Sequence, residues 1–234
     1  MAFQVTKIKV MNDVKRGILF NKYKCNFQFI FRCLMAGNSG CGKTTLTLKM
    51  IVNWEECMDF PPSEVHVFFS HMQEAYEKLL VTSPFPVVLH SEPLHEDFET
   101  KNALVIFDDM QGSDSVSVIK DFFIKKSHHF NTSVIYLVQN LFDKHPAHRF
   151  ISLNSTYIVV FKNPRDASQI MHLNKQIYPH AKNFLTSAYK AITEEGPRSY
   201  MVIDNYPETP ESFRIRNSLF PRMDFGEAFT FTPS

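Results

Sequence analysis

Residues Gly37-Asn38-Ser39-Gly40-Cys41-Gly42-Lys43-Thr44 match the phosphate-binding loop pattern GxxxxGK[ST]. The apolar run 29–36 precedes them and predicts a buried strand, and residues 43–54 predict a helix after them. This strand–loop–helix order gives the pattern its meaning, because the loop points backbone N–H groups at a phosphate and the helix adds its positive end. The alternative interpretation is a glycine turn that contains a lysine by chance. The flanking elements favour binding of a nucleoside triphosphate.

Each position of this loop has an expected role. Lys43 would reach the β- and γ-phosphates, and the Thr44 hydroxyl would ligate Mg²⁺. Glycine at three positions permits backbone angles and close approach that a Cβ would prevent. The residues expected to contact the nucleotide are Gly37, Asn38, Ser39, Gly40, Cys41, Gly42, Lys43, Thr44 and Thr45.

Two acidic residues follow a second apolar run. Asp108 ends the run 103–107, which places it at the carboxyl end of a buried strand, where open α/β sheets bind their ligands. We therefore expect Asp108 to hold Mg²⁺, through water. Asp109 would orient the attacking water or accept its proton. The alternatives are that Asp108 caps the next turn, and that Asp109 only supports Asp108 or caps the following loop.

A third buried run, 132–138, ends in Gln139 and Asn140. The amide of Gln139 would hydrogen-bond both the attacking water and the γ-phosphate, so that the strand end senses hydrolysis. Amides are also common turn residues, and this feature alone is a weak signal. Its weight comes from its place as the third motif after the two nucleotide motifs.

Composition limits the class of protein. A chain of 234 residues with 44% hydrophobic residues suits one domain with a substantial core. No apolar stretch reaches the roughly 18 residues of a membrane-spanning helix, so we expect no membrane association. The first ten residues lack the pattern of a secretory signal. The four cysteines show no CxxC spacing, which predicts neither zinc nor disulfides and favours a reducing, intracellular compartment.

The formal net charge is only +1, so the protein is not a bulk polycation. Charge is uneven, however, and residues 1–28 are predicted to form a basic N-terminal arm. A solvated surface is an equally supported interpretation of this arm. Its basic residues before position 25 are Lys7, Lys9, Lys15, Arg16, Lys22 and Lys24, against Asp13 alone.

Short β-rich runs alternate with helical patterns, which predicts an α/β P-loop NTPase fold of the ASCE/RecA-like type. The expected architecture is a mostly parallel central sheet with helices on both faces. Expected strands are 29–36, 65–70, 86–89, 104–108, 133–138, 157–161 and 200–203, and expected helices are 43–54, 74–81, 115–126, 167–176 and 181–192. Residues 29–206 would form the ATPase domain. Residues 207–234, which contain four prolines, would form an irregular tail packed on it.

Several segments resemble the genome-packaging ATPases of the FtsK–HerA superfamily, most closely those of large eukaryotic DNA viruses and Polinton (Maverick) elements. The likeness covers about residues 29–221, and the block from His128-His129 to Gln139-Asn140 is its most specific part. The position of Lys126 is often glycine in the resembling sequences. The resembling segments are Asp108-Asp109, 126–142, 154–170, 176–179, 214–216 and 219–221.

The resemblance implies an enzyme that hydrolyses ATP with Mg²⁺ and drives double-stranded DNA into a viral or virus-like capsid. It implies a homo-oligomeric ring, pentameric or hexameric, with a capsid or portal protein as a further partner. The expected location is the host nucleus or a cytoplasmic virus factory, or the virion. A neighbouring subunit would supply a catalytic arginine, for which Arg165 is preferred over Arg149. Either arginine is equally well explained by an ordinary salt bridge.

Some assignments remain open on the sequence alone. His128 and His129 would meet DNA or couple the sensor to it, or serve packing and capping. Two other classes of function compete with the motor: a P-loop kinase of nucleotides or small molecules, and a non-catalytic nucleotide-dependent switch. No arginine-rich lid is apparent in the sequence, and the acidic pair with Gln139 better suits water as the acceptor.

Overall fold

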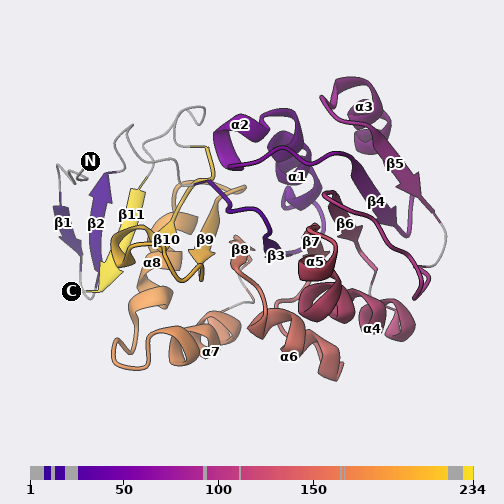
Figure 1. Cartoon of the computed structure of the whole chain (residues 1–234). Coiled ribbons are helices and arrows are strands. Elements are labelled where there is room, and N and C mark those ends of the chain that lie inside the picture. Colours follow the sequence, from indigo (N-terminus) through magenta and orange to yellow (C-terminus); the bar gives the residue numbers. More distant parts are fainter. Residues whose placement is uncertain are drawn as a thin grey trace.

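A single mixed sheet organises the protein, shown in a computed structural model (Figure 1). The structure describes residues 8–11, 14–18, 26–91, 94–110, 112–163, 165, 167–220 and 229–233. Within these residues the sheet has 11 strands in the order β1-β2-β11-β10-β9-β8-β3-β7-β6-β4-β5.

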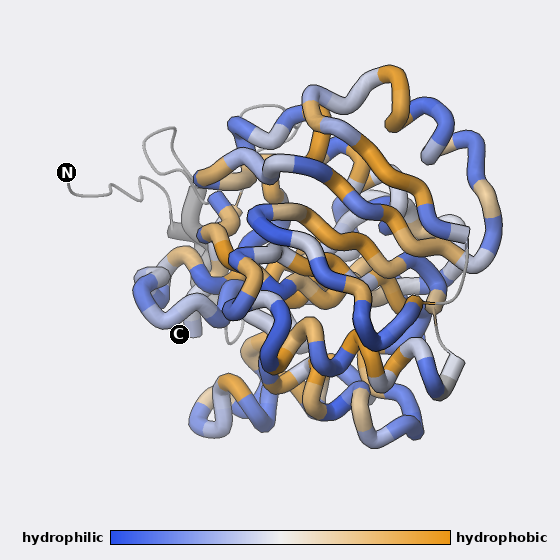
Figure 2. Tube along the Cα trace, turned by 45° about the vertical axis from the view of Figure 1, so that its right-hand side comes forward, coloured by the Kyte–Doolittle hydropathy of each residue, from blue (hydrophilic) through white to orange (hydrophobic). Residues whose placement is uncertain are grey.

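Six neighbouring strands are parallel and confirm the predicted core of an α/β P-loop fold. They are β3 (Arg32–Ala36), β4 (Val65–Phe69), β5 (Val87–His90), β6 (Leu104–Asp108), β7 (Ser133–Val138) and β8 (Tyr157–Phe161). Every residue of β4, β6, β7 and β8 is buried, which explains why these strands read as continuous apolar runs. The predicted bounds of β6, β7 and β8 agree residue for residue with the structure. Figure 2 shows the apolar stretches gathered in the central strands.

Helices cover both faces of the sheet, as predicted. The chain forms α1 (Lys43–Val52), α2 (Trp54–Cys57), α3 (Glu74–Thr82), α4 (Ser113–Asp121), a π-helical turn (Phe122–Lys126), α5 (Ser127–His129), α6 (Pro146–Leu153), α7 (Ala167–Ile177) and α8 (Phe184–Thr193). One apolar cluster joins α1 and α3 to alternate side chains of the strands, such as Cys33 and Met35. The other cluster joins α4, α6, α7 and α8 to the opposite side chains, such as Leu34 and Ala36. The period of two in β3 therefore divides the core into two layers.

The sequence prediction differs from the structure at four helices. One of them is α8, which was expected over 181–192 and begins at Phe184. The expected helix 43–54 is divided at Asn53 into α1 and α2. The expected helix 115–126 begins at Ser113 and passes into the π-helical turn. Helix α6 lies outside the predicted helices, because the residues at its start, Asp143 to Pro146, have the composition of a turn.

An antiparallel extension continues the sheet beyond β8. It consists of β9 (Tyr200–Asp204), β10 (Ile215–Arg216), β11 (Phe229–Pro233), β2 (Val14–Ile18) and β1 (Ile8–Met11). The expectation of an irregular tail after residue 206 is thus wrong for β10 and β11. In the expected basic arm, β1 and β2 form a hairpin that pairs with β11. The parts of the arm and tail at 1–7, 12–13, 19–25, 221–228 and 234 lie outside the described residues.

None of the helices in the described part of the chain has both the length and the apolar character that crossing a membrane requires.

Candidate nucleotide-binding site

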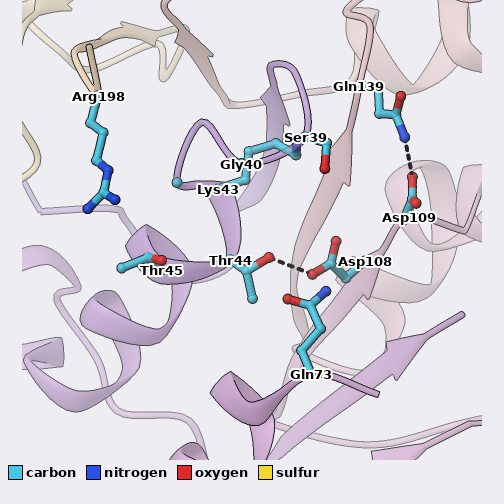
Figure 3. Close-up of a pocket in the computed structure, with 11 residues that line it drawn as sticks. Ser39, Gly40, Lys43, Thr44, Thr45, Gln73, Asp108, Asp109, Gln139 and Arg198 are labelled. Atoms are coloured by element: carbon cyan, nitrogen blue, oxygen red, sulfur yellow. Dashed lines mark hydrogen bonds between the residues drawn. The ribbon is translucent and has the colours of Figure 1, made fainter. Parts of the chain in front are cut away.

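Three sequence motifs meet at the carboxyl edge of the parallel strands. Strand β7 lies between β3 and β6, with Ala36 opposite Val138 and Asp108 opposite Leu137. Because the three strands end at one level, the loops that follow them are neighbours. The sheet therefore brings the phosphate loop, the acidic pair and Gln139 to one place (Figure 3).

The phosphate loop has the backbone that its glycines allow. Gly40 and Gly42 have φ of 76° and 110°, in the left-handed region that other residues rarely adopt. Gly37 needs space instead, since a Cβ there would lie 2.7 Å from Cys41 Sγ and 2.8 Å from Phe161 Cβ. Its backbone N–H donates to the carbonyl of Val138 over 3.1 Å, which fixes the start of the loop to β7.

Lys43, the first residue of α1, holds its amine over the loop. Its Nζ donates to the carbonyl oxygens of Gly37 at 2.6 Å and Asn38 at 3.1 Å. The positive charge thus lies beside the loop and the N-terminus of α1, where a phosphate is stabilised.

Thr44 and Asp108 are joined directly. The Thr44 hydroxyl donates to Asp108 Oδ2 over 2.8 Å, although 64 residues separate them in the chain. Asp108 is 4% exposed. Two oxygen donors at this position, beside Lys43, suit Mg²⁺, which keeps several waters and takes few protein ligands in nucleotide sites. The residues present therefore fit the expected ion.

A third element supports Asp108. The buried Tyr76 on α3 donates its hydroxyl to the same Oδ2 atom over 2.5 Å. Gln73, at the start of α3, donates its side-chain amide to the Tyr76 oxygen over 3.2 Å. Burial and the nearby Asp108 carboxylate raise the pKa of Tyr76, so its hydroxyl stays a donor. Neither residue belongs to a recognised motif, so the sequence prediction missed both.

Asp109 and Gln139 form a second pair on the same side of the site. Gln139 Nε2 donates to Asp109 Oδ1 over 3.2 Å, and both side chains are exposed. Asp109 has φ of 56°, an unfavourable angle for a non-glycine residue. Strain of this kind is often found at functional sites. Figure 3 shows the Asp109 side chain directed toward Gln139.

These residues line one cavity of about 210 Å³. Nine of the lining residues were predicted from the sequence: eight belong to the three motifs, and Thr45 directly follows the phosphate loop. Gly37, Asn38 and Cys41, which were also expected to contact the nucleotide, do not line the cavity. Gln73 and Arg198 also line it, and sequence reasoning missed Arg198 because it lies in a turn without a motif. The lining consists of Ser39, Gly40, Gly42, Lys43, Thr44, Thr45, Gln73, Asp108, Asp109, Gln139 and Arg198.

A pair of asparagines fastens the loop to the segment after β8. Asn38 and Asn163 exchange side-chain hydrogen bonds of 3.0 and 2.9 Å. Asn163 Oδ1 also accepts from the backbone N–H of Arg165 over 3.1 Å. The Asn163 backbone N–H donates to the Tyr189 hydroxyl over 2.8 Å, which ties this segment to α8.

The two candidate catalytic arginines do not line this cavity. Arg165 is exposed beside Asn163, and Arg149 on α6 lines a separate groove against α7. The sequence predicts that a neighbouring subunit supplies this arginine, and one subunit does not test that. The preference for Arg165 over Arg149 therefore stays a prediction.

His128 and His129 lie far from the nucleotide motifs along β7. They precede the amino end of this strand, whereas Gln139 follows its carboxyl end. His128 Nε2 lies 3.0 Å from a guanidinium nitrogen of Arg32. Burial and the Arg32 charge lower the pKa of His128, which favours a neutral ring that accepts this hydrogen bond. Within one chain this geometry gives His128 a packing role at the amino edge of the sheet.

The chain is similar to several solved structures at low sequence identity. No protein-family model matches the chain, and no curated protein matches its sequence. The genome packaging NTPase B204 from Sulfolobus turreted icosahedral virus 2, in complex with sulfate, is 13% identical with a TM-score of 0.49, over 76% of this chain and 93% of that chain. The same NTPase in complex with ATP-gammaS is 12% identical with a TM-score of 0.48, over 76% and 94% of the two chains. The Legionella pneumophila ATPase DotB is 12% identical with a TM-score of 0.36, over 57% and 41%.

Proposed function

We propose that this protein is a Mg²⁺-dependent ATPase that drives double-stranded DNA into a viral or virus-like capsid. The observation that carries the enzymatic part is the 2.8 Å hydrogen bond between Thr44 and Asp108. It joins the phosphate loop to the acidic motif, and the two motifs occur independently in the sequence. The DNA-packaging part rests on the resemblance of residues 126–142 and 154–170 to packaging ATPases of large DNA viruses and Polinton elements.

The proposed chemistry divides among named residues. The loop amides and Lys43 bind the phosphates, while Thr44 and Asp108 hold the hydrated Mg²⁺. The ion, when bound, neutralises charge that develops on the phosphate oxygens. Gln139 orients a water whose oxygen attacks the γ-phosphorus as the bond to the β-phosphate oxygen breaks. Asp109 accepts the proton of this water.

A ring of five or six subunits is part of the proposal. In such a ring Arg165 of a neighbouring subunit would neutralise transition-state charge, with Arg149 as the second choice. A ring needs basic surface only where DNA passes, so a net charge of +1 is compatible with a DNA motor. A capsid or portal protein would be the docking partner, in the nucleus, a virus factory or the virion.

ATP hydrolysis measured with and without duplex DNA, over a range of salt concentrations, tests this function. We expect stimulation by duplex DNA that falls steeply as salt rises, because phosphate contacts release counterions. Lys43→Ala should lose nucleotide binding, and Asp109→Asn should bind ATP without turnover. Equal rates with and without DNA at low salt would contradict the motor, and phosphorylated nucleosides among the products would indicate a kinase.

Native mass spectrometry with an ATP analogue and duplex DNA tests the assembly. A closed ring under these conditions supports the motor. A single subunit that binds nucleotide tightly supports a switch or a kinase instead.

A further inference from the structure

We propose that Arg198 binds the α-phosphate of the nucleotide within its own subunit. This inference rests on the proposed function, since it assigns a further residue to the same site. Arg198 lines the nucleotide cavity together with the phosphate loop, and its side chain is exposed to that space. No hydrogen bond or ion pair to another described residue engages its guanidinium group, which leaves it available for a ligand.

The position of Arg198 follows from the pairing of β8 with β9. These strands are antiparallel, with Phe161 opposite Tyr200. The start of β9 therefore lies beside the end of β8, at the edge where the nucleotide motifs meet. Arg198 lies in the turn before β9, two residues before Tyr200, and this places it at the cavity.

The backbone of this turn is fixed on both sides of Arg198. The carbonyl of Ser199 accepts from the backbone N–H of Lys162 over 2.9 Å. The hydroxyl of Ser199 donates to the carbonyl of Gly196 over 3.0 Å. Pro197 restricts the backbone further. The backbone of Arg198 is therefore held in place before a ligand binds. Binding then costs only the conformational entropy of the Arg198 side chain.

The position of Arg198 along the cavity determines which part of the nucleotide it contacts. In Figure 3 Arg198 lies on one side of the phosphate loop, and Asp109 and Gln139 lie on the other side. The acidic pair and Gln139 mark the end that receives the γ-phosphate. A triphosphate that spans the loop must then direct its α-phosphate and nucleoside toward Arg198. A guanidinium group matches phosphate oxygens with two parallel hydrogen bonds, so the α-phosphate is its best partner.

Arg198 is therefore a binding residue, distinct from an arginine that a neighbour gives to the γ-phosphate. A contact with the α-phosphate is the same in the ground state and the transition state. Its loss should raise KM for ATP and leave kcat unchanged. Loss of a γ-phosphate contact would lower kcat instead.

Calorimetric titration with Mg²⁺ and ADP provides the direct test, because ADP lacks the γ-phosphate and is not turned over. Arg198→Ala should weaken ADP binding about tenfold, as expected for a charge-assisted hydrogen bond. Arg198→Lys should restore only part of this affinity, since a lysine cannot bind two oxygens in the same way. Lys190→Ala removes an exposed charge from the preceding helix and should bind ADP like the wild type.

The outcomes separate this inference from the proposed function. Unchanged ADP affinity in Arg198→Ala, or a loss of kcat at unchanged KM, would overturn the assignment to the α-phosphate. If the wild-type protein itself binds neither ADP nor ATP, and Lys43→Ala behaves identically, the proposed function has failed instead.

Discussion

Asp108 is the residue on which most of the site converges, because its Oδ2 atom accepts hydrogen bonds from both Thr44 and Tyr76. Tyr76 touches neither the cavity nor the expected phosphates, so we regard it as a positioning residue. The two hydrogen bonds to Oδ2 fix the rotamer of Asp108. They therefore also fix the position of Oδ1. Precise placement of a metal-holding carboxylate depends on such outer contacts.

Tyr76→Phe should loosen the Asp108 carboxylate and weaken Mg²⁺-dependent binding of ADP. The lost hydrogen bond to a charged group corresponds to roughly 1.5 kcal/mol, or about a tenfold loss of affinity. Titration of ADP with and without Mg²⁺ measures the effect, which should be confined to the Mg²⁺-dependent part. Tyr136→Phe removes a buried hydroxyl bonded to the Met110 carbonyl on the other face of the sheet. This control should leave the Mg²⁺ dependence unchanged, and an equal loss in both variants would contradict the positioning role.

Gly37→Ala tests the space beneath the phosphate loop. The added Cβ would lie 2.8 Å from Phe161 Cβ, a backbone-linked atom that cannot swing away. We expect a loss of about 1–3 kcal/mol in the free energy of unfolding, together with weaker nucleotide binding. Thermal unfolding should show a melting temperature lower by roughly 2–4 °C per kcal/mol. Gly196→Ala is the matched control, since its Cβ would meet only Ser199 Oγ at 3.7 Å. Equal stability of the two variants would show that the loop can move away from β8.

At the scale of elements, the sequence predicts a strand or helix best where its residues fit only one type of structure. The strands β6, β7 and β8 are continuous apolar runs between polar turns, and their predicted bounds match the structure. Helix α6 was missed because Asp143 to Pro146 has the composition of a turn. Pro146 instead occupies the first turn of the helix, and the His145 side chain caps it by accepting from the Ala147 N–H over 3.3 Å. Turn residues and helix-start residues share one composition, so the pattern alone did not distinguish them.

Helix α6 also makes stability depend on pH through His148. This residue is 3% exposed, its ring centroid lies 5.8 Å from that of Tyr136, and its Nδ1 has no partner among the described residues. Burial lowers the pKa of His148 below the ordinary value of 6.5, and the nearby Asp143 opposes this only in part. The unfolded chain therefore binds the proton more readily than the folded chain. The resulting stability is fully present above pH 6.5 and is lost as the pH falls through the lower folded-state pKa.

His148→Leu should flatten the decline of stability between pH 7.5 and 5.5. Urea unfolding at both values measures the free energy of unfolding. Some decline should remain, because burial also lowers the pKa of His90. His71→Leu, at an exposed position, should retain the wild-type slope. The role of His148 is excluded if its variant keeps that slope too.

At the scale of the whole molecule, sequence motifs identified the chemical groups but not the residues that hold them. The phosphate loop, the acidic pair and Gln139 are short patterns with fixed spacing, and the structure brings them to one edge of the sheet. Tyr76, Asn163 and Arg198 reach that edge only through sheet order and pairing between distant strands. Such contacts have no local pattern. The same reason explains why β10, with 2 residues, and β11 were not predicted.

A buried ion pair joins β10 to β9, the strand of the antiparallel extension that lies next to the parallel core. Arg216 on β10 is 1% exposed and Asp204 on β9 is 3% exposed. An Arg216 guanidinium nitrogen lies 3.3 Å from Asp204 Oδ2. The other carboxylate oxygen accepts from the Tyr206 N–H and the Thr209 hydroxyl, both at 3.0 Å. Strand β9 in turn pairs with β8 along its whole length, with Asp204 opposite Tyr157. We therefore expect the extension to unfold together with the parallel core.

Removing one partner should therefore destabilise the entire domain. We expect Arg216→Met and Asp204→Asn each to lower the free energy of unfolding by about 3–5 kcal/mol, because each variant leaves a buried polar group without its partner. The double variant should lose less free energy of unfolding than the two single variants lose together, because it leaves no buried charge without a partner. Urea unfolding followed by both fluorescence and circular dichroism should give one coincident transition. The control is Glu211, whose side chain is exposed in its ion pair with the half-buried Arg214, and Glu211→Gln should cost less than about 1 kcal/mol. Two separate transitions, or strictly additive losses, would show that the extension is an independent unit attached to the parallel core.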